Sequence, residues 1–273
     1  MRNQIQPLQV QNLIRIVERN LLALVISLSV MVSAGAVQNQ QISSVKKAKR
    51  PAHTISELEI SEARALLDQL GYWVNMEAPG RDASLRHALI AFQKIEGRER
   101  TGVLTIEELD ALRAARRPQP LETGYPHIEI NLVSQVLFVV DCPEAALRIL
   151  PISSGSGEFF TEGGETRQAV TPTGRFKVYR QVEGWRKSPL GSLYYPNYIY
   201  YGIAIHGNPS VPPHPASHGC IRIPMFASRE FSEIVTIGMD VLVYDDEPLE
   251  EIGADSANSI TEATNPGIAT AII

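Results

Sequence analysis

The sequence predicts a multidomain protein in which a small all-α module of three helices precedes a mainly β domain, sandwich-like or barrel-like. The chain has 273 residues, of which 44% are hydrophobic, and is long enough for two ordinary domains. Apolar residues recur at helical spacing over residues 55–117, whereas they alternate or form short runs over residues 126–245. The proline-punctuated segment 118–125 separates these two patterns, and we interpret it as a linker.

The first 37 residues have the pattern of a signal peptide or an N-terminal anchor. An apolar run at 20–37 follows three arginines, and the AGA at 34–36 resembles a signal-peptidase site. We expect export to the periplasm or cell wall, with cleavage after Ala36. The run is about as short as a membrane-spanning helix can be, so an uncleaved membrane anchor stays open. Residues 38–54, which include KKAKR, are predicted to be a basic linker.

Charge and cysteine content exclude several classes of protein. The net charge of −5 offers no electrostatic case for binding nucleic acid. Two cysteines are too few for a disulfide scaffold, although one Cys142–Cys220 bridge stays open in an oxidising compartment. Residues 246–273 begin acidic and lack periodicity, so they are predicted to form a disordered acidic tail.

Three helices are predicted within residues 55–117. Each carries apolar residues at helical spacing, and Gly71 and Gly97 are expected to end the first two. The first and third have sequences typical of a capping box. The capping pairs are Ser56 with Glu59 and Thr105 with Glu108, and the second helix is expected to start near Ser84.

The β domain is predicted from short apolar segments separated by Gly, Pro and Ser. The expected strands are 127–132, 135–141, 146–152, 175–180, 198–206 and 240–246, and a single helix is expected at 225–235. Five tyrosines lie near the expected strand at 198–206, and strand packing is the expected role of at least half of them. They are Tyr194, Tyr195, Tyr198, Tyr200 and Tyr201.

The loop that follows the strand at 198–206 gathers residues able to perform nucleophilic catalysis. A cysteine thiol becomes a good nucleophile when an imidazole or backbone amides favour its thiolate. His206 ends the predicted strand and is positioned to act as a base toward Cys220. Gly219 allows a turn whose N–H groups, with those of His218 and Cys220, converge as an oxyanion pocket. This layout suits acyl transfer.

Two other interpretations of the loop stay open. His214, His218 and Cys220 are of the types that bind zinc, but three nearby prolines forbid the regular helix on which such a pair normally lies. A disulfide would instead block the Cys220 thiol. Either would make the chain a non-catalytic wall-binding protein with a zinc- or disulfide-stabilised β domain. We predict neither a metal nor a cofactor.

Both modules resemble known families. The stretches LLDQLGYW at 66–73, ALIAFQKIEG at 88–97 and GVLTIEELDAL at 102–112 resemble the three-helix peptidoglycan-binding domain, which implies docking to the cell wall. His206-Gly207, then Ser217-His218-Gly219-Cys220 and Arg222, strongly resemble the signature of the L,D-transpeptidase (YkuD-like) catalytic domain. This second similarity covers about residues 126–245, and it implies a YkuD-type fold for the β domain.

The L,D-transpeptidase resemblance implies a mechanism. Cys220 would attack the carbonyl after the third residue of a peptidoglycan stem tetrapeptide, D-alanine would leave, and the acyl group would pass to an amine on a second stem as a 3→3 cross-link. In some relatives the acceptor is a lipoprotein side chain, and water as acceptor would give an L,D-carboxypeptidase. The partners are thus stem peptides and the cell wall. Family members are also acylated by carbapenems at the active-site cysteine.

The same resemblance assigns roles to the loop residues. His206 would be the proton acceptor and donor, with its ring oriented by the Gly207 carbonyl. His218 and Gly219 would shape the oxyanion pocket together with Cys220. Arg222 would hold a substrate carboxylate, for which its bidentate guanidinium is suited. Ser217 is placed on the substrate side of the site, chiefly to fix the turn.

Overall fold

The computed structural model describes residues 54–140 and 147–246. The predicted signal or anchor, nearly all of the basic linker, Cys142 and the acidic tail after residue 246 lie outside the described residues. Within the described ranges, no helix is long and apolar enough to cross a membrane. Over the described residues, both the helical module and the β domain belong to one compact unit.

The predicted helical module is present as α2 (Glu57–Gln69), α3 (Ala83–Ile95) and α4 (Ile106–Ala114). Ser56 and Glu59 form the expected capping box, and Thr105 caps α4 by accepting from the Glu108 amide. The cap of α3 is Asp82, whose carboxylate accepts from the amides of Ser84 and Leu85. Gly71 and Gly97 follow the first two helices with φ of 94° and 62°, as residues that end helices commonly do.

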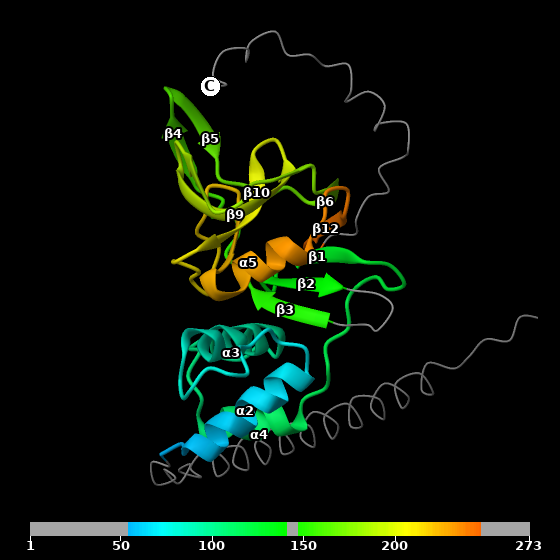
Figure 1. Ribbon diagram of the computed structural model, residues 1–273. Coiled ribbons are helices and arrows are strands. Elements are labelled where there is room, and N and C mark those ends of the chain that lie inside the picture. The colour runs from blue at the N-terminus through cyan, green and yellow to red at the C-terminus, as the bar shows by residue number, and fades with distance from the viewer. Residues whose placement is uncertain (1–53, 141–146, 247–273) are drawn as a thin grey trace, which may run out of the picture. The chain divides into compact units, whose positions relative to one another are not determined.

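The β domain packs two sheets face to face (Figure 1). The first has the order β3 (Leu147–Pro151), β2 (Val136–Val140), β1 (His127–Asn131), β12 (Asp240–Tyr244) and β6 (Gly174–Lys177). The second has the order β11 (Ile221–Pro224), β10 (Ile203–Asn208), β9 (Gly191–Tyr200) and β7 (Arg180–Gln181), with β8 (Trp185–Ser188) also paired to β9. One apolar core contains side chains of both sheets and of α5 (Met225–Ile234), so the predicted mainly β sandwich is confirmed.

The predicted single strand at 198–206 is wrong. Tyr201 and Gly202 have φ of 29° and 86° and form a tight turn that separates β9 from β10. A two-residue hairpin turn with positive φ at both residues matches the twist of the strands that it joins. The continuous apolar run therefore folds back on itself, and its two halves pair antiparallel.

Apolar patterning also does not predict four strands that surround the site. The hairpin of β4 (Phe159–Glu162) and β5 (Glu165–Gln168) is largely exposed on both faces, as is β8. Without a buried face, these strands show no alternation of apolar and polar residues. The fourth, β11, has only four residues and follows the loop directly.

The helical module and the first sheet share a hydrophobic core. Residues 71–73 pair with the outer edge of β3: the Trp73 amide donates to the Ile149 carbonyl at 2.9 Å, and the Ile149 amide donates to the Gly71 carbonyl at 2.8 Å. Phe92 of α3 and Phe138 of β2 belong to the same apolar cluster. The segment 71–73 thus covers a sheet edge that would otherwise expose unpaired backbone groups.

Candidate active site

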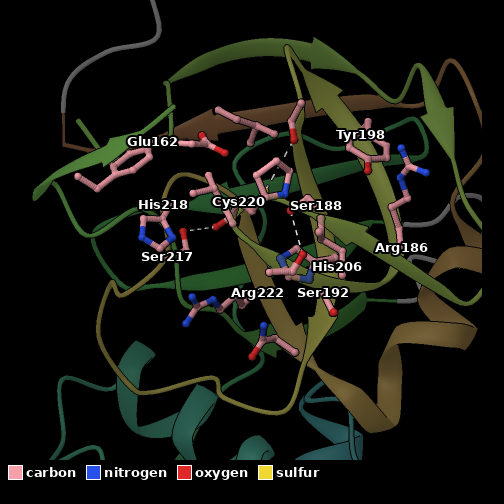
Figure 2. Close-up of a pocket in the computed structure, with 18 of the residues that line it drawn as sticks. Glu162, Arg186, Ser188, Ser192, Tyr198, His206, Ser217, His218, Cys220 and Arg222 are labelled. Atoms are coloured by element: carbon pink, nitrogen blue, oxygen red, sulfur yellow. Dashed lines mark hydrogen bonds between the residues drawn. The ribbon is translucent and has the colours of Figure 1, made fainter. Parts of the chain in front are cut away.

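Two parallel strands place the predicted catalytic residues on one face of the second sheet. Strand β10 pairs with β11 so that Ile205 lies opposite Ile221 and His206 opposite Arg222. Because side chains alternate along a strand, the isoleucines enter the core and His206 and Arg222 face the other way. Cys220 directly precedes β11 and shares this face by the same alternation. Figure 2 shows Cys220, His206 and Arg222 in the same pocket.

The turn before Cys220 is fixed by the Ser217 hydroxyl. Ser217 Oγ donates to the Cys220 carbonyl at 2.5 Å and accepts from the Gly219 amide at 3.0 Å. Gly219 has a φ of 130°, and a Cβ there would lie 2.9 Å from the Val170 carbonyl oxygen. Only glycine fits such a backbone without strain. The Ser217 hydroxyl is therefore used inside the turn rather than held free for substrate.

One predicted oxyanion donor, the Gly219 amide, is engaged in a hydrogen bond within the turn. Because the Gly219 amide already donates to Ser217 Oγ, it is not available to a developing oxyanion while the turn keeps this geometry. Of the predicted backbone donors, the amides of His218 and Cys220 flank this position. The His218 ring packs edge-on against Phe160 of β4, with centroids 4.7 Å apart, and lines the pocket.

The His206 ring is held in one tautomer. Its Nδ1 lies 2.9 Å from the Gly207 carbonyl oxygen, and since a carbonyl can only accept, Nδ1 carries the proton. The other nitrogen, Nε2, is then an acceptor while the ring is neutral. Burial lowers the pKa of His206 to about 4, with the bond to Gly207 opposing the shift. His206 is thus a neutral base at physiological pH.

Position 207 must be glycine because helix α5 approaches β10 closely. A Cβ at Gly207 would lie 2.2 Å from Ser228 Oγ, on α5. The Ser228 hydroxyl is itself held by the Pro224 carbonyl at 2.7 Å. The glycine therefore lets α5 pack against the strand while its carbonyl stays in place for His206.

The Cys220 side chain is a free, partly exposed thiol. Burial raises its pKa, and the Ala204 amide and the Arg222 charge oppose this shift without cancelling it. Its Sγ lies 3.8 Å from the Gly202 carbonyl oxygen, at the β9–β10 turn. The resting sulfur is therefore a protonated thiol, and such a thiol becomes a good nucleophile only when a base removes its proton.

Arg222 offers an unpaired cation to the pocket. Its backbone exchanges two hydrogen bonds with Ser153, at 3.0 and 3.1 Å. Its guanidinium has no hydrogen-bond or ion-pair partner in the part of the chain that the structure describes. Desolvation lowers its pKa, but an arginine stays charged at any physiological pH. An unpaired, partly buried guanidinium can bind a carboxylate in the bidentate manner.

The predicted catalytic side chains open into a pocket of about 520 Å³ between two hairpins. The β4–β5 hairpin contributes Phe160 and Glu162, and the β8–β9 hairpin contributes Arg186 and Ser192. Figure 2 labels Glu162, Arg186 and Ser192 around the pocket. Two of the five tyrosines, Tyr198 and Tyr201, also line it. The lining residues of the hairpins are not predicted from sequence. The only signals are turn residues, Gly163-Gly164 in one hairpin and the Pro189-to-Gly191 turn in the other.

The zinc interpretation finds no support in the described residues. No group of three or more His, Cys, Asp or Glu side chains converges anywhere within 54–140 and 147–246. The His214 carbonyl accepts from Ser153 Oγ at 2.8 Å, which ties this residue to the sheet through its backbone. Cys142, which would pair with Cys220 in the alternative with a disulfide, lies outside the described residues.

Comparisons with known proteins agree with this architecture. Residues 125–243 match the YkuD family, described as the L,D-transpeptidase catalytic domain. A crystal structure of an L,D-transpeptidase from Xylanimonas cellulosilytica is 35% identical, with a TM-score of 0.65, over 71% of this chain and 97% of that chain. Its match is longer than the catalytic domain alone. A search of curated proteins finds no match.

Two further solved structures are less similar. An L,D-transpeptidase (Yku) from Stackebrandtia nassauensis is 20% identical over 73% of this chain and 97% of that chain, with a TM-score of 0.42. An L,D-transpeptidase from Mycobacterium smegmatis is 17% identical over 44% of this chain and 58% of that chain, with a TM-score of 0.34. By its match to the catalytic domain and its 35% identity to a solved member, this chain belongs to the YkuD family of L,D-transpeptidases.

Proposed function

We propose that the protein is an exported, cysteine-dependent L,D-transpeptidase that forms 3→3 cross-links between peptidoglycan stem peptides. The observation that carries this proposal is the shared face of His206 and Cys220: a neutral imidazole with one free nitrogen lies on the same side of paired strands as a protonated thiol. Arg222, whose guanidinium has no partner among the residues that the structure describes, supplies in the same pocket the cation that a peptide carboxylate needs.

The first half-reaction forms a thioester. The Cys220 thiol gives its proton to His206 Nε2 as sulfur attacks the carbonyl carbon after the third stem residue. The resulting oxyanion is stabilised by backbone amides near His218 and Cys220. The intermediate then expels the amine of D-alanine, which takes the proton back from His206. Atoms and charges balance without a cofactor.

The second half-reaction transfers the acyl group. An amine of a second stem peptide attacks the thioester, gives a proton to His206 Nε2, and forms a new amide. The Cys220 sulfur leaves and is reprotonated by His206. Water in place of the amine gives the hydrolysed tripeptide, so the acceptor decides between transpeptidase and carboxypeptidase products.

The test is product analysis by mass spectrometry. The purified chain is incubated with a disaccharide-tetrapeptide, and D-alanine, tripeptide and cross-linked dimer are quantified. We expect D-alanine and a tripeptide–tetrapeptide dimer in equal amounts, and neither with Cys220→Ser. Tripeptide without dimer would replace transpeptidation with hydrolysis, and D-alanine release by Cys220→Ser would contradict the nucleophile. Detection of the chain in the extracytoplasmic fraction of cells tests export.

A further inference from the structure

Lys94 of helix α3 is a buried lysine that reaches into the catalytic domain. The residue is 3% exposed. Its Nζ donates to the carbonyl oxygens of Gln135, at 2.9 Å, and Ile152, at 2.8 Å. Among the described residues its partners are these carbonyls and no carboxylate. Burial lowers the pKa of Lys94 to about 7, because burying an ammonium without a counter-charge is unfavourable, and an apolar side chain of similar length would fill the position at lower cost. The contact is therefore more than packing.

Gln135 and Lys94 together hold the segment that follows β3. Gln135 has a φ of 58°, and its carbonyl accepts from the Ile152 amide as well as from Lys94. Its side chain binds Ser154 twice: Oε1 accepts from the Ser154 amide at 3.0 Å, and Nε2 donates to Ser154 Oγ at 2.7 Å. Residues 152–154 are thus fixed by one side chain of the helical module and one of the β1–β2 turn.

Residues 153 and 154 in turn hold the backbone on both sides of Cys220. The Ser154 carbonyl accepts from the amides of Ala216 and Ser217, each at 2.9 Å. Ser153 pairs with Arg222 through two backbone bonds. One short segment, residues 152–154, therefore connects Lys94 to the turn at 217–220 through hydrogen bonds.

The helical module also contacts the loop before Cys220 directly. Arg100, just after α3, donates from Nη1 to the Pro213 carbonyl at 3.1 Å. This bond is exposed and of modest strength, whereas those of Lys94 are buried. Arg100 thus contacts the loop before Cys220 directly, whereas Lys94 acts on it only through residues 152–154.

From these contacts we propose that Lys94 is a positioning residue for acyl transfer. Through the segment 152–154 it sets the geometry of the turn at 217–220, so the helical module is part of the catalytic unit and not only a wall-docking module. The proposal rests on the proposed function because its effect is on the reactivity of Cys220.

The test compares Lys94→Met with Phe92→Leu in the full-length chain. Met fills the space without the two hydrogen bonds, and Phe92 lies on the same helix in the core shared with β2 and β3. Acylation by a carbapenem is followed by mass spectrometry at a temperature where each variant is fully folded. For Lys94→Met we expect the maximal acylation rate to fall at least tenfold, with the half-saturating concentration changed less than threefold. For Phe92→Leu we expect both to stay within twofold of the wild type.

A second variant tests the same proposal in case Lys94→Met does not fold. Gln135→Asn keeps a residue that tolerates positive φ but is one methylene too short to bind Ser154 in the same way. It is expected to slow acylation in the same manner. In hydrogen exchange, peptides covering 213–222 should exchange faster in Lys94→Met and Gln135→Asn than in Phe92→Leu.

The outcomes distinguish the positioning role of Lys94 from the proposed function on which it rests. Wild-type acylation rates in Lys94→Met and Gln135→Asn, or an equal loss in Phe92→Leu, would overturn the positioning role and leave the proposed function intact. No adduct on the wild-type Cys220 would overturn both.

Discussion

The Nδ1–H of His206 donates to the carbonyl oxygen of Gly207, its own neighbour in the chain, at 2.9 Å. This bond leaves Nε2 as the nitrogen that can accept a proton, on the strand face shared with Cys220. A glycine is needed at 207 because α5 leaves no room for a Cβ. Gly207 thus lets α5 pack against β10 and also fixes the tautomer of His206, the candidate base.

Replacing His206 should remove the base without removing the fold. We expect His206→Gln to slow acylation of Cys220 by about 10²–10⁴-fold, the usual contribution of general base catalysis. His87→Gln is the matched control, because His87 is half-buried and also has a pKa lowered to about 4, chiefly by burial, but lies on α3. Stopped-flow acylation by a carbapenem measures both. A similar loss in the two variants would indicate general destabilisation instead.

The pH dependence of acylation and of alkylation should follow the shifted pKa values of His206 and Cys220. His206 accepts a proton only when neutral, and its pKa is about 4, so the rate should hold down to about pH 5 and fall below that. An unshifted histidine would lose activity near pH 6.5. Since burial raises the pKa of Cys220, alkylation by iodoacetamide should rise only at alkaline pH. An alkylation plateau near pH 6 would instead indicate a thiolate–imidazolium pair.

Gly219 should tolerate no side chain. Gly219→Ala combines a φ of 130° with a Cβ 2.9 Å from the Val170 carbonyl oxygen, and we expect a loss of about 1–3 kcal/mol in stability. Acylation should fall as the turn shifts. Gly124→Ala is the control, since its φ is 96° with nothing within 4 Å of a Cβ. Equal losses in urea unfolding would show that backbone strain alone, and not the close contact, makes glycine necessary.

Arg222 should act on binding more than on chemistry. Losing a charged hydrogen bond to a substrate carboxylate costs about 1.5–3 kcal/mol, so Arg222→Gln is expected to raise KM for the tetrapeptide about 10–100-fold with a smaller change in kcat. Arg229→Gln on α5 is the control, because this exposed arginine pairs with Glu233 at 2.9 Å. A fall in kcat at unchanged KM would contradict the carboxylate-binding role.

The helices and strands that bury an apolar face are predictable from the sequence. Leu85, Leu89 and Phe92 repeat at helical spacing and become the core of α3, and the apolar runs become the central strands. The hairpin at 159–168 has no such face, so only Gly163-Gly164, both with positive φ, indicates it. The apolar run at 198–206 contains a turn that the sequence pattern does not indicate, because Tyr201 continues the hydrophobic run.

The candidate site is predictable for a different reason. His206, Ser217 and Cys220 lie within one short stretch, where residue types and spacing indicate acyl transfer beside other possibilities, and the family resemblance assigns the roles. Two features depend on the three-dimensional path of the chain and cannot be inferred in this way. The Gly219 amide is occupied by Ser217, and Lys94 reaches Ile152, which is 58 residues along the chain. Both become visible only when the turn and helix α3 are placed in space.

The most direct measurement is the intact mass of the chain after incubation with a carbapenem, with the adduct located by peptide digestion. The account predicts one adduct per chain, on Cys220, and none in Cys220→Ser. An unmodified wild-type chain, or an adduct that persists in Cys220→Ser, would contradict the assignment of Cys220 as the nucleophile.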